Sequence, residues 1–173
     1  MITNETINTI LNRRSIRKFK NQEIEKEKLD IIMKCGTMAP SAMNHQSSLI
    51  VLLKDEEIKK ELFRITDLYY PKKSPYFYGA KTIIIVFGDS TCKCPIEDGS
   101  LVLENMFLAA KSLGVVSCWI NYLRDLFKTK EGQALQEKMN IDKKYFVVGT
   151  CILGYPDEEP LAKARKDGYI REI

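Results

Sequence analysis

The chain has 173 residues, of which 45% are hydrophobic and 29% charged, and its formal net charge is +4. These values are close to the averages of soluble globular proteins, which excludes the disordered and fibrous classes. The length fits a single domain over residues 1–173 with a sizeable core. The longest apolar runs, such as 83–87, are too short for a bilayer, so we expect no membrane protein.

Cysteine usage favours a reducing compartment. The five cysteines are odd in number and scattered through apolar segments, unlike the even, dense spacing of a secreted disulfide framework. Residues 1–12 contain no basic cluster followed by an apolar stretch, which argues against a secretory signal. We therefore expect a cytoplasmic protein.

The N-terminal third predicts two helices. Asn4 is a suitable N-cap for the first, in which apolar residues recur at helical spacing as far as Leu11. Residues 25–35 predict a second amphipathic helix, with Gly36 as its C-cap.

The middle of the chain alternates loops with apolar segments. Residues 38–47 predict a loop, and 49–53 predict a short buried strand. Asp55 is placed to cap the next helix. The aromatic, proline-interrupted segment 69–79 predicts an ordered loop that could act as a lid, and 82–87 is the clearest strand of the chain.

The C-terminal half continues the alternation. Residues 97–113 predict a helix that is apolar on most sides, so it must be central to the core or pack partly on another subunit. Gly114 ends this helix. The remaining segments predict a strand at 115–120, a helix at 129–139 and a strand at 145–153. This order indicates an α/β or α+β sandwich with helices covering a central sheet.

Several chemistries are disfavoured by the residues present. His45 is the only histidine and lies in a polar loop, so a Ser-His or Cys-His catalytic dyad is not expected. The glycines match neither the Rossmann fingerprint nor the P-loop. Cys92 and Cys94 lack the second ligand pair that structural zinc needs, so no metal site is predicted.

Basic residues crowd two short segments, 13–20 and 163–166. Guanidinium groups hold phosphate oxygens in a bidentate manner, so an anionic ligand is the natural candidate. The alternative is that both segments are solvated surface, which is the usual fate of basic runs. An RNA-binding module is disfavoured because no aromatic recognition motif accompanies the basic residues.

Four sequence segments together carry a family resemblance. They are RRSIRKF at 13–19, APSAMNHQ at 39–46, the stretch from Leu113-Gly114 to Ser117-Cys118-Trp119-Ile120, and LGYP at 153–156 followed by KARK at 163–166. In this order and spacing the chain resembles the nitroreductase family of FMN-dependent NAD(P)H oxidoreductases. The resemblance implies an α+β three-layer sandwich with a central mixed sheet flanked by helices. It also implies a homodimer with the flavin sites at its interface.

The resemblance assigns the basic residues to the flavin. Arg13, Lys163 and Arg165 would hold the FMN phosphate, with Arg14 and Ser15 near it and the ribityl chain. Arg17 would lie at the pyrimidine edge of the ring, where a fixed cation favours acceptance of hydride.

The same resemblance assigns two further segments. Ser41 and Asn44 would reach the flavin from the partner subunit, on a loop that also contributes Pro40, Ala42 and Gln46. Without a ligand, these polar side chains could simply hold a turn. Backbone groups near Ile120 and Asn121 would contact the flavin around N5.

The implied reaction is a ping-pong transfer of hydride from NAD(P)H through flavin N5 to a small acceptor such as a nitroaromatic or a quinone. No protein side chain need act as an acid or base, because the cofactor does the chemistry. Related alternatives are a flavin reductase, a dehalogenase, a flavin-fragmenting enzyme or a non-enzymatic flavin carrier. The natural acceptor and the choice between NADH and NADPH stay open.

The chain departs from the family pattern after the tryptophan. Asn121-Tyr122-Leu123 is bulkier than the small residues common there, which alters the expected substrate pocket. Trp119 itself is expected to serve core or subunit packing.

Overall fold

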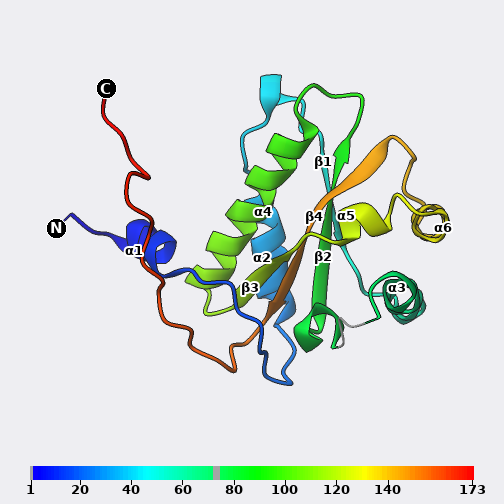
Figure 1. Cartoon of the computed structure of the whole chain (residues 1–173), viewed down its shortest axis with the longest axis horizontal. Coiled ribbons are helices and arrows are strands. Elements are labelled where there is room, and N and C mark those ends of the chain that lie inside the picture. Colours follow the sequence, from blue (N-terminus) through cyan, green and yellow to red (C-terminus); the bar gives the residue numbers. More distant parts are fainter. Residues whose placement is uncertain (1, 72–74) are drawn as a thin grey trace.

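An antiparallel sheet of four strands forms the centre of the structure, which is a computed structural model describing residues 2–71 and 75–173 (Figure 1). The strand order is β1-β2-β4-β3. The strands are β1 (Ser48–Leu52), β2 (Thr82–Asp89), β3 (Val116–Ile120) and β4 (Tyr145–Gly154). The helices are α1 (Glu5–Asn12), α2 (Lys26–Gly36), α3 (Glu56–Tyr69), α4 (Pro95–Ser112), α5 (Leu123–Leu126) and α6 (Lys130–Lys138), with 3₁₀ turns at Ala42–Asn44 and Tyr76–Gly79.

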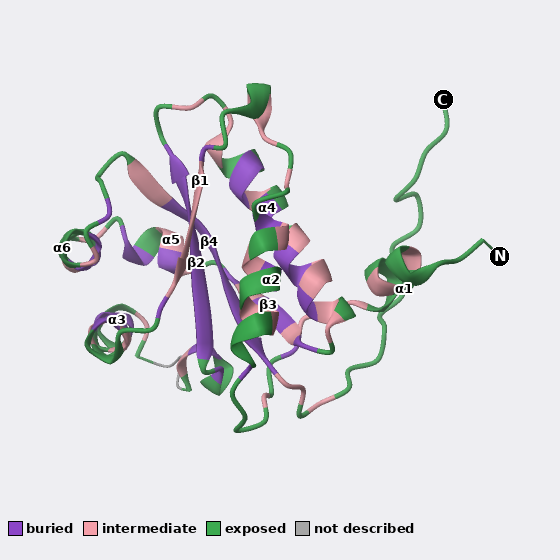
Figure 2. Cartoon of the chain, turned by 180° about the vertical axis from the view of Figure 1, so that it is seen from behind, coloured by how far each residue is buried: buried purple, intermediate pink, exposed green. Residues whose placement is uncertain are grey.

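Helices cover both faces of the sheet, and Figure 2 shows the buried strand β2 and the mostly buried β4 between them. On one face α2 and α4 pack against Ile84 and Val86 of β2. On the other face α3, α5 and α6 enclose Ile83, Ile85 and Phe87. Every residue of β2 is buried because alternate side chains enter these two cores. The predicted three-layer α+β sandwich is therefore confirmed.

The pairing of the sheet is more uniform than expected. All three strand pairs are antiparallel, so the parallel component of the expected mixed sheet is confined to an isolated bridge between Ser15 and Ser117. This bridge places the basic segment that follows α1 alongside β3.

Helix caps lie where the sequence predicted them. The Asn4 side chain accepts a hydrogen bond from the Ile7 amide, and Asp55 caps α3 in the same way. Gly114 ends α4 with a φ of +73°, a left-handed conformation that glycine adopts readily.

The prediction that Gly36 caps α2 is wrong. Gly36 is the last residue of the helix, and Thr37 follows as the cap. A Cβ at Gly36 would lie 2.9 Å from Met106 Cγ, so the glycine lets α2 approach the Met106 side chain of α4 closely.

The central helix α4 lies against the sheet at small residues. A Cβ built on Gly99 would meet Val148 of β4 at 2.8 Å, which shows how closely helix and strand approach. The helix is nevertheless exposed along part of its length, with Ile96 and Leu101 44% and 45% accessible in the single chain. The buried residues Leu103, Met106 and Ala110 confirm that α4 is a core helix, while packing of its exposed part on another subunit stays a prediction.

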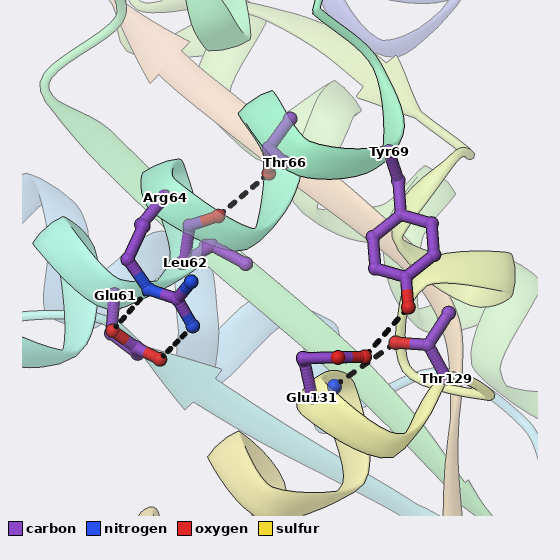
Figure 3. A network of polar contacts seen from close by, with 8 residues as sticks. Glu61, Leu62, Arg64, Thr66, Tyr69, Thr129 and Glu131 are labelled. Atoms are coloured by element: carbon purple, nitrogen blue, oxygen red, sulfur yellow. Dashed lines mark hydrogen bonds and ion pairs between the residues drawn. The ribbon is translucent and has the colours of Figure 1, made fainter.

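Polar contacts join the helices of the opposite layer. The Tyr69 hydroxyl donates to Glu131 at 2.6 Å and links α3 to α6, while Arg64 forms a two-pronged contact with Glu61 on the surface of α3 (Figure 3). Such exposed contacts contribute little stability individually.

The predicted lid at 69–79 is only partly described, since residues 72–74 lie outside the described residues. The 3₁₀ turn Tyr76–Gly79 packs onto the body through Phe77, which is buried between Phe63 and Tyr122.

Within residues 2–71 and 75–173, no helix combines the length and apolar character needed to cross a membrane.

Candidate functional site

The basic segment after α1 runs beside strand β3. The Ile16 amide donates to the Ser117 carbonyl at 3.0 Å, and Ser15 forms the parallel bridge to the same residue. Ile120 and Asn121 follow three and four residues further along the chain, at the end of the strand. The structure thus brings together two groups of predicted site residues that are a hundred residues apart in sequence.

Arg13 and Arg14 are held near the second half of α4. Arg13 Nε lies 3.5 Å from a Glu104 carboxylate oxygen, and the guanidinium carbon lies 5.9 Å from the centre of the Phe107 ring. Arg14 Nη1 donates to the carbonyls of Leu11 and Arg13 at 2.8 and 2.7 Å. Both guanidinium groups are therefore positioned by contacts within the chain before any ligand binds.

Arg17 points toward the 3₁₀ turn at 76–79. Its guanidinium lies over the Tyr78 ring at 5.8 Å from the ring centre, a cation–π arrangement. Its backbone amide donates to the carboxylate of Glu158. Tyr78, Ile120 and Asn121 line one cavity of about 160 Å³, so Arg17 contacts a residue of the cavity wall without lining the cavity itself.

A larger hollow of about 870 Å³ lies where the two ends of the chain meet. Arg13, Arg14 and Lys111 contribute three positive charges to its lining, and Asp157, Glu158 and Glu159 contribute three negative charges. The size suits a cofactor or other organic ligand. Since the charges balance, anion binding here would depend on directed guanidinium hydrogen bonds more than on net charge.

Lys163 and Arg165 are not brought into this hollow. Its lining ends at Ala162, and both residues lie on the exposed C-terminal segment, which extends away from the sheet beside α1 (Figure 1). The predicted meeting of Lys163 and Arg165 with Arg13 is therefore not made within a single chain.

The loop from Pro40 to Gln46 adopts an unusual backbone conformation. Met43, Asn44 and Gln46 have φ values of 53°, 57° and 50°, in the left-handed region that residues other than glycine seldom adopt. Ser41 Oγ accepts a hydrogen bond from the Gln46 amide at 2.9 Å, which closes the loop on itself. The expected turn held by side-chain bonds is thus present.

This loop and the arginines lie at different levels along α4. The Ala42 amide contacts Asp98 in the first turn, whereas Arg13 lies against Phe107, nine residues further on. Nine helical residues rise by about 13 Å. Figure 1 shows the 42–44 turn near the N-terminal end of α4 and the segment after α1 near the other end. The two halves of the predicted site do not converge in one chain.

Two groups near β3 have shifted proton affinities. Burial raises the pKa of the Cys118 thiol, and the nearby charge of Arg17 opposes this effect only in part. Burial also raises the pKa of Tyr122 well above its usual range. Its hydroxyl is buried without a hydrogen-bond partner among the described residues. The centre of its ring lies 5.2 Å from the centre of the Tyr70 ring. Both groups stay neutral at physiological pH, which suits packing better than proton transfer.

Trp119 serves core packing, as expected. Its ring lies 6.1 Å from that of Phe107, and a Cβ on Gly149 would contact its indole nitrogen at 2.7 Å.

His45 is exposed at the end of the 3₁₀ turn. In the described part of the chain, no three side chains of His, Cys, Asp or Glu are grouped so as to hold a metal ion.

Asp98 and Ser47 were missed by sequence reasoning, whereas Tyr78 lies within the aromatic segment 69–79 that was predicted as a lid. Asp98 is 3% exposed although it carries a carboxylate. An acidic residue in the first turn of a helix usually indicates only a favourable interaction with the helix dipole, so its burial could not be read from the sequence.

Comparison with known proteins first defines the class. The structure superimposes on a nitroreductase with bound FMN from Bacteroides fragilis with a TM-score of 0.88 and 28% identity, covering 99% of this chain and 100% of the other. The layered sheet and the surrounding helices are therefore those of a flavoprotein fold.

The family follows from the sequence matches. Residues 10–68 and 66–155 match the model of the nitroreductase family, and the chain belongs to that family. A putative NADH dehydrogenase/NAD(P)H nitroreductase from Archaeoglobus fulgidus is 31% identical over 161 residues, covering 90% of this chain and 87% of the relative. An NADPH-flavin oxidoreductase from Vibrio harveyi is 26% identical over 183 residues, covering 96% and 72%.

Proposed function

We propose that this chain is an FMN-dependent oxidoreductase that takes reducing equivalents from NAD(P)H and transfers them to a small acceptor. The observation that carries the proposal is the superposition, over nearly the whole chain, on a nitroreductase with bound FMN. The position of Arg13 and Arg14 supports it, because both guanidinium groups line a hollow large enough for a phosphorylated cofactor, and Ser15 pairs with β3 beside them.

The residues of the chain would bind and orient the cofactor. Arg13 would hold the phosphate, joined in the assembled protein by Lys163 and Arg165, and Arg14 and Ser15 would lie near the phosphate and the ribityl chain. Arg17 would leave its stacked position on Tyr78 to neutralise charge at the pyrimidine edge of the ring. When bound, FMN would supply the hydride chemistry through N5 in two separate half-reactions.

A homodimer would complete the site. In one chain the loop at 40–46 and the arginine segment lie far apart along α4, so a shared site would take Pro40, Ser41, Ala42, Asn44 and Gln46 from one subunit and the arginines from the other. Exposed apolar residues support this assembly: Leu101 on α4 is 45% accessible, and Leu11 on α1 is 59% accessible. Apolar helix faces of this kind are commonly covered by a second subunit.

A planar acceptor of modest size suits the cavity at the end of β3. The cavity of about 160 Å³ is lined by Tyr78 and Tyr122 together with Ile120 and Asn121. A nitroaromatic compound or a quinone could stack on such aromatic walls. The likeness to an NADPH-flavin oxidoreductase favours free flavin as a second candidate acceptor. Acceptor profiling with nitrobenzene derivatives, benzoquinones and free riboflavin would separate the two.

A subunit-mixing experiment tests the shared site. Arg13→Ala and Asn44→Ala each damage one half of the proposed site, and each homodimer is expected to bind FMN weakly. Random reassociation of the two variants makes half of the dimers mixed, and each mixed dimer holds one intact site. We expect about one quarter of the wild-type FMN sites to return on mixing. If each site lay within one chain, mixing would restore no binding, and the proposal of an interface site would fail.

A further inference from the structure

A buried carboxylate ties the loop at 40–46 to the central helix. Asp98 is 3% exposed, and its two oxygens accept hydrogen bonds from the Ala42 amide at 2.9 Å and from the Ser47 hydroxyl at 2.7 Å. A buried carboxylate is costly unless such donors satisfy it. Asp98 also lies in the first turn of α4, where the helix dipole favours negative charge. The sequence places this group 56 residues away from Ala42, so the contact is made only by the fold.

The loop needs such a tie to hold its shape. Three of its residues, none of them glycine, adopt positive φ. This conformation has an elevated energy and persists only when the surrounding structure fixes it. Its other hydrogen bonds are local: Asn44 N donates to the Ser41 carbonyl, and Gln46 N donates to the Ser41 hydroxyl. Met43 at its tip is 80% exposed and provides no core contact. The two bonds to Asp98 tie the loop near both of its ends; the Ser47 end is also held by the Asp89 amide, which donates to the Ser47 carbonyl, so the bond to the Ala42 amide is the long-range tie within the loop itself.

We propose that Asp98 is a positioning residue for cofactor binding, which holds the loop at 41–46 in its binding-competent shape through the Ala42 amide and the Ser47 hydroxyl. The inference rests on the proposed function, in which Ser41 and Asn44 contact the flavin of the partner subunit. Asp98 touches no ligand itself. It acts by keeping these two side chains in place before the cofactor arrives, so that binding does not have to order the loop.

Two substitutions at Asp98 separate geometry from charge. Asp98→Ala removes both acceptors and leaves the Ala42 amide unpaired. Asp98→Asn keeps the shape: its oxygen can accept from the Ala42 amide, and its NH₂ group can donate to the Ser47 hydroxyl, which serves as donor or acceptor. A positioning role therefore predicts that Asp98→Asn keeps the FMN affinity and the protection of the Ala42 amide that Asp98→Ala loses.

The test uses two readouts on the whole 173-residue chain. Hydrogen exchange of the Ala42 amide, measured without FMN, reports the tie directly. FMN affinity, measured by quenching of flavin fluorescence below the melting temperature, reports its consequence. If the competent loop falls to about one tenth of the population in Asp98→Ala, the FMN dissociation constant rises about tenfold, while Asp98→Asn stays within about threefold of wild type.

Asp55→Ala is the matched control. It also removes a hydrogen-bonded carboxylate near the start of a helix, but on α3 at the opposite face of the sheet. We expect it to lower the melting temperature without changing FMN affinity or exchange at Ala42.

The outcomes decide between the alternatives. Unchanged Ala42 exchange and unchanged FMN affinity in Asp98→Ala would overturn the inference, as would an Asp98→Asn variant as defective as Asp98→Ala. If Asp98→Ala does not fold, Ser47→Ala carries the test, with faster Ala42 exchange and weaker FMN binding expected, and wild-type values overturning the inference. A wild-type protein that binds no FMN would refute the proposed function alone, since exchange at Ala42 would still test the tie.

Discussion

The close approach of α4 to the sheet makes Gly99→Ala a sharp test of the packing. The added methyl group would lie 2.8 Å from Val148 Cγ2 and 2.9 Å from Cγ1. Val148 is fully buried and β-branched, so its methyl groups cannot rotate away freely. Overpacking of this kind costs about 1–3 kcal/mol. Alanine regains about 1 kcal/mol of helix propensity over glycine. The variant should therefore lose about 1 kcal/mol in its free energy of unfolding.

A double-mutant cycle with Val148→Ala isolates the contact. Truncating Val148 opens the space that the new methyl group needs, so Gly99→Ala should be neutral or stabilising in that background. We expect a coupling energy of about 1–2 kcal/mol between the two positions. Urea denaturation of all four proteins at one fixed protein concentration measures it, because subunit association also shifts stability. Additivity within about 0.5 kcal/mol would refute the close approach of Gly99 to Val148.

Three further predictions concern other parts of the molecule. Gly132→Ala places a Cβ 2.1 Å from the Leu126 carbonyl oxygen, a backbone atom that cannot swing aside, so urea melts should show a loss of about 3 kcal/mol or more; a wild-type midpoint would contradict this. The Lys144 ammonium, and to a smaller extent Thr91, lower the pKa of Asp89 from 3.8 to about 2. The charged Asp89 therefore stabilises the fold above pH 4, and this stabilisation is lost as the pH falls toward 2. Asp89→Asn should flatten the pH dependence of the free energy of unfolding in that window. The same pH dependence in the variant as in the wild type would count against the ion pair. Arg17→Ala should slow anaerobic reduction of bound flavin by NADPH at least about tenfold, as followed by stopped-flow absorbance, and an unchanged rate would remove Arg17 from its proposed role.

Much of the fold was predictable because the local signals are strong and agree with one another. Asn4 and Asp55 cap their helices as their residue types predict, and the β-branched run of β2 is buried on both faces as its composition indicates. Helix α5 was not predicted, since four residues are too few to show a helical period. It is fixed by tertiary contacts, including burial of Leu123 and a hydrogen bond from Arg124 to the Val148 carbonyl.

The residues of the proposed site could be named from the sequence, but the way in which the fold places them could not. The basic segment and the loop at 40–46 stand out through composition and family resemblance, yet neither shows where it lies relative to α4. The role of Asp98 depends on a partner 56 residues earlier in the chain, and the need for glycine at position 99 depends on a strand that follows it. Contacts of this kind are set by the completed fold and leave no periodic signal in the sequence.

The visible absorption spectrum of the purified protein, recorded before and after anaerobic addition of NADPH or NADH, tests the central claim most directly. The account predicts flavin bands, or their appearance with FMN bound in proportion to protein, and bleaching of these bands by the reduced nicotinamide. A colourless protein that binds no added FMN would contradict the account, and the basic residues beside β3 would then need a different ligand.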